Sequence, residues 1–127
     1  VGDHTLPQLA SLPLRACQCG FCRRHGARTT SDPSSRLTIA AAPGALRRYR
    51  FGRKAVDVLL CGDCGAYVAS VLTTPDGAWA TLNTTGVDLA GFAGRAAEPA
   101  VYDDETDAAR LARRLARWTP TILAEAA

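Results

Sequence analysis

The stretch Cys17-Gln18-Cys19-Gly20-Phe21-Cys22 decides the fold, because it places three thiols within six residues. A second pair, in Cys61-Gly62-Asp63-Cys64, follows about forty residues later, and the two clusters contain all five cysteines of the chain. Thiolates this close in sequence, with glycines beside them, are typical of a site for a soft tetrahedral cation such as zinc. Disulfides fit poorly, because the cysteine count is odd and nothing else in the sequence indicates secretion. Five unrelated buried cysteines would not be expected to cluster in this way.

Composition predicts one globular domain over residues 1–127. Hydrophobic residues make up 47% and charged residues 21% of the sequence, which are ordinary values for a soluble domain. No apolar run is long enough to cross a bilayer, and the N-terminus lacks the charged start and apolar core of a signal peptide. We therefore expect a cytoplasmic protein without a membrane partner. The net charge of +3 suits a small anionic ligand but is too weak to indicate a nucleic-acid partner.

Several short segments have the pattern of β-strands, bounded by turn residues: 37–40, 46–51, 56–60, 66–73 and 79–83. Because Cys61 and Cys64 lie between two of these segments, we expect them at the tip of a β-hairpin, the usual place for a zinc knuckle. Gly52-Arg53-Lys54 is a second hairpin connection under this interpretation. Residues 86–102 are rich in Gly and Ala, and we expect a loop there with one short extended piece.

The end of the chain predicts a helix over about residues 104–118, which begins among acidic residues and ends near Pro120. Apolar residues recur at helical spacing on one side of this helix: Ala108, Leu111, Ala112, Leu115 and Trp118. The other side carries Arg110, Arg113, Arg114 and Arg117, and we interpret it as a solvated surface. The whole pattern predicts a mainly β protein of short antiparallel strands pinned by metal, with a C-terminal helix on the outside.

The stretch from Cys17 to Ala27, Cys-x-Cys-x-x-Cys followed by Arg-Arg-His-Gly-Ala, resembles the glutathione-dependent formaldehyde-activating family, also called the centromere protein V family. Tyr49-Arg50-Phe51-Gly52 and Cys61-Gly62-Asp63-Cys64-Gly65 follow in the order and at the distance that this family shows. The resemblance covers roughly residues 12–90.

This resemblance implies a β-tent fold, which consists of stacked antiparallel sheets with zinc knuckles, and it implies two zinc sites. Cys17, Cys19 and Cys22 would form a three-thiolate site with an open position for catalysis. Cys61 and Cys64 would join an earlier Cys-x-Cys in a closed structural site. The implied activity is that of a carbon–sulfur lyase, which condenses glutathione with formaldehyde to S-hydroxymethylglutathione and reverses the reaction.

The sequence departs from the family in residues 1–16, which contain no cysteine and only His4 as a soft ligand. Either the family's first strand is missing here, or the structural site has been lost or rebuilt. An alternative is that Cys61 and Cys64 join two of the first three cysteines in one closed zinc site, which would make the chain a non-catalytic, zinc-stabilised binding module. A third possibility is that the cysteines bind no metal.

Under the lyase hypothesis, an open zinc could lower the pKa of a bound thiol or polarise the aldehyde oxygen. Arg23, Arg24 and Arg28 could clamp a carboxylate of glutathione, or simply be surface charges. His25 could shuttle a proton, or be a polar loop residue. Glutathione follows from the resemblance alone, so another cellular thiol remains an alternative substrate.

Overall fold

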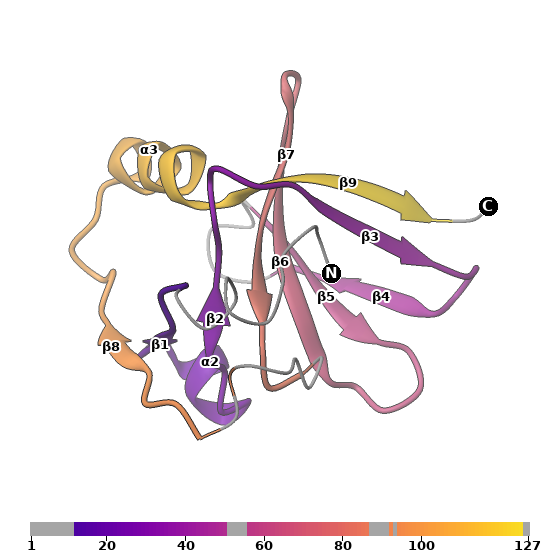
Figure 1. Ribbon diagram of the computed structural model, residues 1–127, viewed down its shortest axis with the longest axis horizontal. Coiled ribbons are helices and arrows are strands. Elements are labelled where there is room, and N and C mark those ends of the chain that lie inside the picture. The colour runs from indigo at the N-terminus through magenta and orange to yellow at the C-terminus, as the bar shows by residue number, and fades with distance from the viewer. Residues whose placement is uncertain (1–11, 51–55, 87–91, 93, 126–127) are drawn as a thin grey trace.

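The computed structural model describes residues 12–50, 56–86, 92 and 94–125, and this part of the chain is mainly β (Figure 1). Its two helices are α2 (Gly20–Arg24) and α3 (Asp107–Arg117). Its nine strands are β1 (Arg15–Cys17), β2 (Thr29–Thr30), β3 (Leu37–Ala41), β4 (Leu46–Tyr49), β5 (Asp57–Cys61), β6 (Tyr67–Thr74), β7 (Gly77–Asn83), β8 (Glu98–Ala100) and β9 (Thr119–Glu125). The predicted fold class, mainly β with a helix near the C-terminus, is confirmed.

Strand β7 joins the two parts of the β-structure. The long path of hydrogen-bonded strands runs β4-β5-β6-β7-β2-β1-β8. The end of β7 pairs with β2, whereas Trp79 and Ala80 nearer its start pair with Pro120 and Thr119 of β9. Strand β9 in turn pairs with β3, and these two strands run side by side as a branch that leaves the main sheet at β7 (Figure 1).

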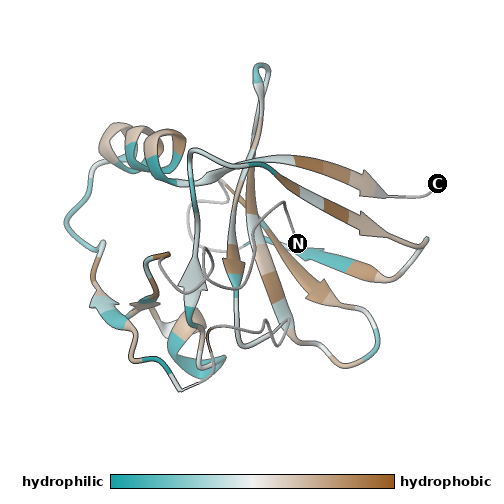
Figure 2. Cartoon of the chain, in the orientation of Figure 1, coloured by the Kyte–Doolittle hydropathy of each residue, from teal (hydrophilic) through white to brown (hydrophobic). Residues whose placement is uncertain are grey.

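The main apolar core lies where this branch faces the main sheet. Its buried members come one each from β3, β5, β6 and β7: Leu37, Leu59, Val71 and Ala80. Ile39, Leu46 and Leu123 pack against them, and apolar segments accordingly recur along β3, β5, β6 and β9 (Figure 2). This core fixes the position of β7. Strand β7 pairs with β2, and β2 pairs with β1, which ends at Cys17 of the first cysteine cluster.

Two strand pairings differ from the antiparallel arrangement that we predicted. Strands β3 and β9 are parallel, and so are β1 and β8. Each of these pairs joins segments about eighty residues apart in the sequence. No hairpin or turn motif in the sequence therefore predicts the pairing. Strand β9 itself was not predicted, because Pro120 indicated only the end of a helix. Pro120 is the second residue of β9, a position near a strand end where a missing N–H is tolerated.

The second cysteine pair lies at a hairpin tip, as predicted. Cys61 ends β5, Tyr67 begins β6, and the backbone N–H of Gly65 donates to the carbonyl of Cys61 at 2.9 Å. Gly65 has a φ of +76°, which favours glycine at this turn. The extended piece expected within 86–102 is β8. The predicted hairpin connection at residues 52–54 lies outside the described residues.

Helix α3 is oriented opposite to our prediction. Leu111 and Leu115 of its apolar side are 43% and 40% exposed, whereas Arg110, Arg113 and Arg114 are turned inward and half-buried. The interpretation of the basic side as solvated is therefore wrong for these three arginines, because they line a cavity. Of the four arginines on this side, Arg117 is exposed. The helix also begins later than predicted, since Thr106 is its N-cap. Within the described residues, no helix is long and apolar enough to span a bilayer.

Candidate metal centre

The thiols of Cys17, Cys19 and Cys22 meet at one point, with their Sγ atoms all within 4.8 Å of one another. Cys17 ends β1, Cys19 is the N-cap of α2, and Cys22 lies within that helix. The extended backbone of Cys19 lets its Sγ accept a hydrogen bond from the N–H of Cys22 at 3.4 Å. Strand β8 holds the other side of the cluster, because Gln18 donates its N–H to the carbonyl of Ala100 at 2.9 Å. The five-residue helix thus folds three nearby cysteines onto one another.

This arrangement fits a thiophilic metal ion. Zinc binds thiolates at about 2.3 Å, so two sulfur ligands of a tetrahedral zinc lie roughly 3.8 Å apart. The sulfurs of the three half-buried cysteines lie within 4.8 Å of one another, which is compatible with this spacing. They also line the wall of a cavity of about 270 Å³, which leaves room beside them. Three protein ligands with space for a fourth group is the ligand set of a catalytic zinc site, not of a closed structural one.

The cluster favours a thiolate before any metal binds. A hydrogen bond from the Cys22 thiol lowers the pKa of Cys17 to about 6, and backbone hydrogen bonding at Cys19 and the charge of Arg113 act in the same direction. The same hydrogen bond, together with burial, raises the pKa of Cys22. Of the two thiols, Cys17 is therefore the one that ionises first. A site that is already partly ionised loses fewer protons when it binds a cation.

The same cavity is also lined by arginines of two elements. Arg15 comes from β1, and Arg110, Arg113 and Arg114 come from α3. Burial and the charges of Arg113 and Arg110 lower the pKa of Arg114 to about 10. The lining also contains aromatic and hydroxyl side chains and one acid: Phe21, Thr29, Tyr67, Ser70, Thr81, Tyr102, Trp118 and Asp103. The cavity therefore combines a cluster of thiols with a surplus of cations.

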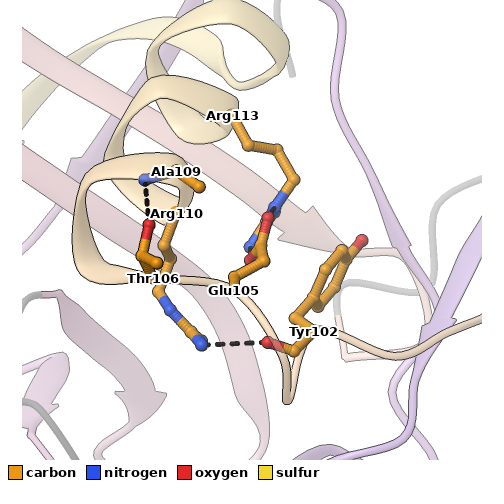
Figure 3. A network of polar contacts seen from close by, with 6 residues as sticks. All are labelled: Tyr102, Glu105, Thr106, Ala109, Arg110 and Arg113. Carbon is orange, nitrogen blue, oxygen red and sulfur yellow. Dashed lines mark hydrogen bonds and ion pairs between the residues drawn. The ribbon is translucent and has the colours of Figure 1, made fainter.

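A network at the start of α3 positions two of these arginines, Arg110 and Arg113 (Figure 3). Arg113 donates from Nε and Nη2 to the two carboxylate oxygens of Glu105, at 2.9 and 3.0 Å, and its guanidinium lies 3.7 Å from the ring centroid of Tyr102. Arg110 donates from Nη2 to the Tyr102 carbonyl at 3.0 Å. Thr106 Oγ1 caps the helix by accepting from the N–H of Ala109 at 3.1 Å. The segment that leads into α3 is thus tied to the first turns of the helix.

Tyr67 and Ser70 place a pair of hydroxyls in the cavity lining. Their oxygens are 2.6 Å apart, and Tyr67 is 3% exposed. Burial raises the pKa of Tyr67, so its hydroxyl stays neutral at physiological pH and can donate a hydrogen bond.

The other residues with predicted roles lie elsewhere. Arg23, Arg24 and His25 are exposed and do not line this cavity. His25 stacks on Phe21, with ring centroids 4.3 Å apart. Arg28 donates from Nη2 to the carbonyls of Phe92, at 2.9 Å, and Arg95. It therefore holds a loop, while the substrate and proton-transfer roles of these four residues stay predictions.

Cys61 and Cys64 do not join the first cluster. In the part of the chain that the structure describes, Cys17, Cys19 and Cys22 are the one group of three or more metal-ligating side chains. Hydrogen bonds from the backbone N–H groups of Cys64 and Asp63 lower the pKa of Cys61, as expected for a knuckle-like turn. The closed site that combines both clusters is not formed among these residues. His4 lies outside them.

Sequence reasoning missed Arg15, the pair Tyr67 and Ser70, and the inward side of α3. The arginine spacing on α3 was visible, but a solvated helix surface shows the same spacing. Only the cavity beneath the helix distinguishes the two cases.

Comparisons with known proteins add little to this picture. No family model matches the chain, and no curated protein does. Among solved structures, the chain is similar to the crystal structure of a Rhodobacter sphaeroides protein from the Northeast Structural Genomics programme. The two are 23% identical with a TM-score of 0.47, and the match covers 68% of this chain and 78% of that chain. The fold and the site define a mainly β protein with a three-cysteine cluster able to hold a metal ion, and the functional argument rests on that cluster and its cavity.

Proposed function

We propose that this chain is a zinc-dependent carbon–sulfur lyase that acts on the adduct of a thiol, such as glutathione, with formaldehyde or another small aldehyde. The observation that carries the proposal is the position of three clustered cysteines in the wall of a cavity. The resemblance of Cys17–Ala27 to the formaldehyde-activating family supports the same reading.

The reaction needs little besides orientation and the movement of one proton. In the direction of condensation, a bond forms between the thiol sulfur and the aldehyde carbon, and the proton lost by sulfur ends on the former carbonyl oxygen. Cys17, Cys19 and Cys22 would hold the zinc, which, when bound, supplies Lewis acidity toward a thiol or a carbonyl oxygen.

The residues that line the cavity would exclude water and stabilise the developing charge. Trp118 and Val58 are buried apolar residues of the lining, and they limit the water around the reacting atoms. The neutral hydroxyl of Tyr67, with Ser70 at 2.6 Å, is suited to donate a hydrogen bond to the aldehyde oxygen as negative charge develops there.

Metal content is the first test. We expect freshly reduced, purified protein to carry one zinc bound by three sulfurs and one lighter atom, as measured by elemental analysis and X-ray absorption at the zinc edge. Cys19→Ser should lose most of this zinc and remain folded by circular dichroism. Cys64→Ser, at the exposed hairpin tip, is the matched control and should retain the metal. Protein without metal would overturn the mechanism, and a zinc shell of four sulfurs would favour the binding module.

Turnover is the second test. Exchange between glutathione, formaldehyde and S-hydroxymethylglutathione can be followed by NMR, with the spontaneous rate subtracted. We expect the zinc-loaded protein to accelerate this exchange and Cys19→Ser to return it to the spontaneous rate. Zinc-loaded protein that gives no acceleration with glutathione or with other cellular thiols would contradict the enzymatic proposal while leaving the metal site in place.

A further inference from the structure

The inverted orientation of α3 points to a ligand. The helix leaves Leu111 and Leu115 in solvent, 43% and 40% exposed, and directs Arg110, Arg113 and Arg114 into the cavity. Burying cations while exposing leucines is unfavourable for both kinds of side chain. Arg117, on the same helix, is exposed, so an arginine of α3 can be solvated where the cavity is not involved. The orientation is therefore explained by something that the arginines do inside the cavity.

The charges in the cavity are not balanced by the described residues. Glu105 forms an ion pair with Arg113, and its charge also acts on Arg110 and Arg114. The guanidinium of Arg110 donates to the carbonyl of Tyr102. The buried Nε atoms of Arg110 and Arg114 have no hydrogen-bond partner among the described residues. Arg114 instead lies over the ring of Trp118, with its guanidinium carbon 5.2 Å from the ring centroid.

Arg15 adds a further cation to the same lining, and its Nη2 donates to Ser31 Oγ at 2.6 Å. Asp103 is the one acidic residue that the described lining contains, and it is exposed. Four arginines thus face one cavity with a single acid in its wall. Of these four, Arg113 forms an ion pair with Glu105. An anion that enters this cavity would therefore find the donors of Arg15, Arg110 and Arg114 already close together and without an ion-paired carboxylate of their own among the described residues.

We propose that Arg15, Arg110 and Arg114 bind an oxyanion, a carboxylate or a phosphate-type group, of the ligand that occupies the cavity beside the cysteine cluster. A guanidinium presents parallel N–H donors that match two oxygens of such a group. Desolvation in the cavity strengthens these charge-assisted hydrogen bonds. Arg113, fixed by Glu105, adds positive potential without being the principal donor.

The consequence for substrate choice rests on the proposed lyase function. If the cavity binds a thiol adduct, its thiol part carries an anionic group, and neutral thiols such as 2-mercaptoethanol are poor substrates. The anion site itself can be tested without any turnover, so the two proposals fail separately.

The test is the binding of inorganic phosphate and of succinate to the purified full chain, by isothermal titration calorimetry at constant ionic strength. We expect saturable binding of at least one of these anions at one site per chain. Arg114→Met should weaken it about tenfold or more, the loss expected when one charge-assisted donor pair is removed. Arg117→Met, with the same charge change on the exposed side of α3, should bind within about twofold of the wild type. Equal effects of the two variants, or no saturable binding of either anion, would overturn the proposal.

A second measurement needs no variant and covers the case in which Arg114→Met fails to fold. Phenylglyoxal modifies arginine, and mass spectrometry locates the modified residues. Phosphate or succinate should protect Arg114 and Arg110 and leave Arg117 unprotected. The relative protection by the two anions distinguishes a phosphate ligand from a carboxylate ligand. Anion binding that disappears when zinc is removed and leaves the arginines unprotected would place the anion on the metal and contradict the proposed site.

Discussion

Asn83 ties the region of the cysteine helix to the strand that carries Tyr67. Its Oδ1 accepts from the N–H of Arg28 at 3.0 Å, and its Nδ2 donates to the carbonyl of Tyr67 at 2.9 Å. The side chain is 2% exposed, so water cannot replace either bond. One amide thereby ties the segment that follows α2 to the start of β6, where Tyr67 lines the cavity.

Asn83→Ala should lower the free energy of unfolding by about 2–4 kcal/mol, because it leaves two buried backbone groups without partners. Urea unfolding followed by circular dichroism measures the change. Thr73→Ala, an exposed position on β6, is the control and should change stability by less than about 0.5 kcal/mol. A similar small change for Asn83→Ala would show that the two bonds do not stabilise the fold.

Glu105 gives a pH-dependent contribution of known sign. Hydrogen bonds from Arg113 hold the pKa of its carboxyl below the ordinary value of 4.5. The stabilisation is therefore present above pH 4.5 and is lost as the pH falls below that value. Because the pair is partly exposed, Glu105→Gln should lower the thermal midpoint by only about 1–4 °C at pH 7.

The same comparison at low pH checks the sign. The midpoints of the wild type and Glu105→Gln should converge as the pH is lowered from 5 to 3, because protonation of the wild-type carboxyl progressively removes the charge that the variant lacks. Asp104→Asn, exposed and adjacent, should show no comparable convergence. A difference for Glu105→Gln that persists at pH 3 would assign the effect to packing instead of charge.

Helix α3 depends on Thr106 for its start, since its hydroxyl accepts the N–H of Ala109 (Figure 3). Thr106→Ala should destabilise the chain by about 1 kcal/mol, the usual cost of a lost N-cap. Thermal unfolding measures it, and Thr106→Ser, which keeps the hydroxyl, should restore nearly all of the loss. If alanine and serine give the same stability, the hydroxyl is not what holds this end of the helix.

Elements were predictable from the sequence to the extent that their signals are local. Acidic residues followed by helical periodicity predicted α3, and the turn residues between β5 and β6 predicted the hairpin at Cys61 and Cys64. The facing of α3 was not predictable from hydrophobic periodicity, because that rule assumes that the apolar side is buried. In α3 the arginine side faces the cavity and the leucine side faces solvent. The parallel partners of β1 and β3 depend on distant segments, so short-range patterns do not contain them.

The branch formed by β3 and β9 closes the core of the protein. Leu123 of β9 packs against the cluster that contains Leu37 and Leu59, and the start of β9 also pairs with β7. Removing residues 119–127 should therefore abolish cooperative unfolding, as measured by urea titration and by dispersion of NMR signals. Ile122→Thr, at a position 58% exposed, should unfold cooperatively. A truncated chain that keeps a cooperative transition would show that β9 is an accessory strand.

The candidate site likewise has one part that local sequence patterns predict and one part that depends on distant segments. The cysteine cluster was readable from its spacing alone, because Cys17, Cys19 and Cys22 are brought together by one short helix. The arginines that share the cavity come from α3, some ninety residues further along the chain. Their approach to the sulfurs depends on the pairing of β1 with β8 and of β9 with β7. Sequence spacing therefore predicted the cysteine cluster but not the cavity around it.

The pairing of β1 with β8 has a consequence for synthesis on the ribosome. Cys17, Cys19 and Cys22 emerge about eighty residues before Ala100, whose carbonyl holds the backbone of Gln18. At about 5–20 residues per second, this interval lasts roughly 4–16 seconds. During that time the three thiols are in the cell without the strand and the helix that later enclose them. The thiols of the nascent chain can therefore meet a metal ion, or an oxidant, well before the cavity has formed.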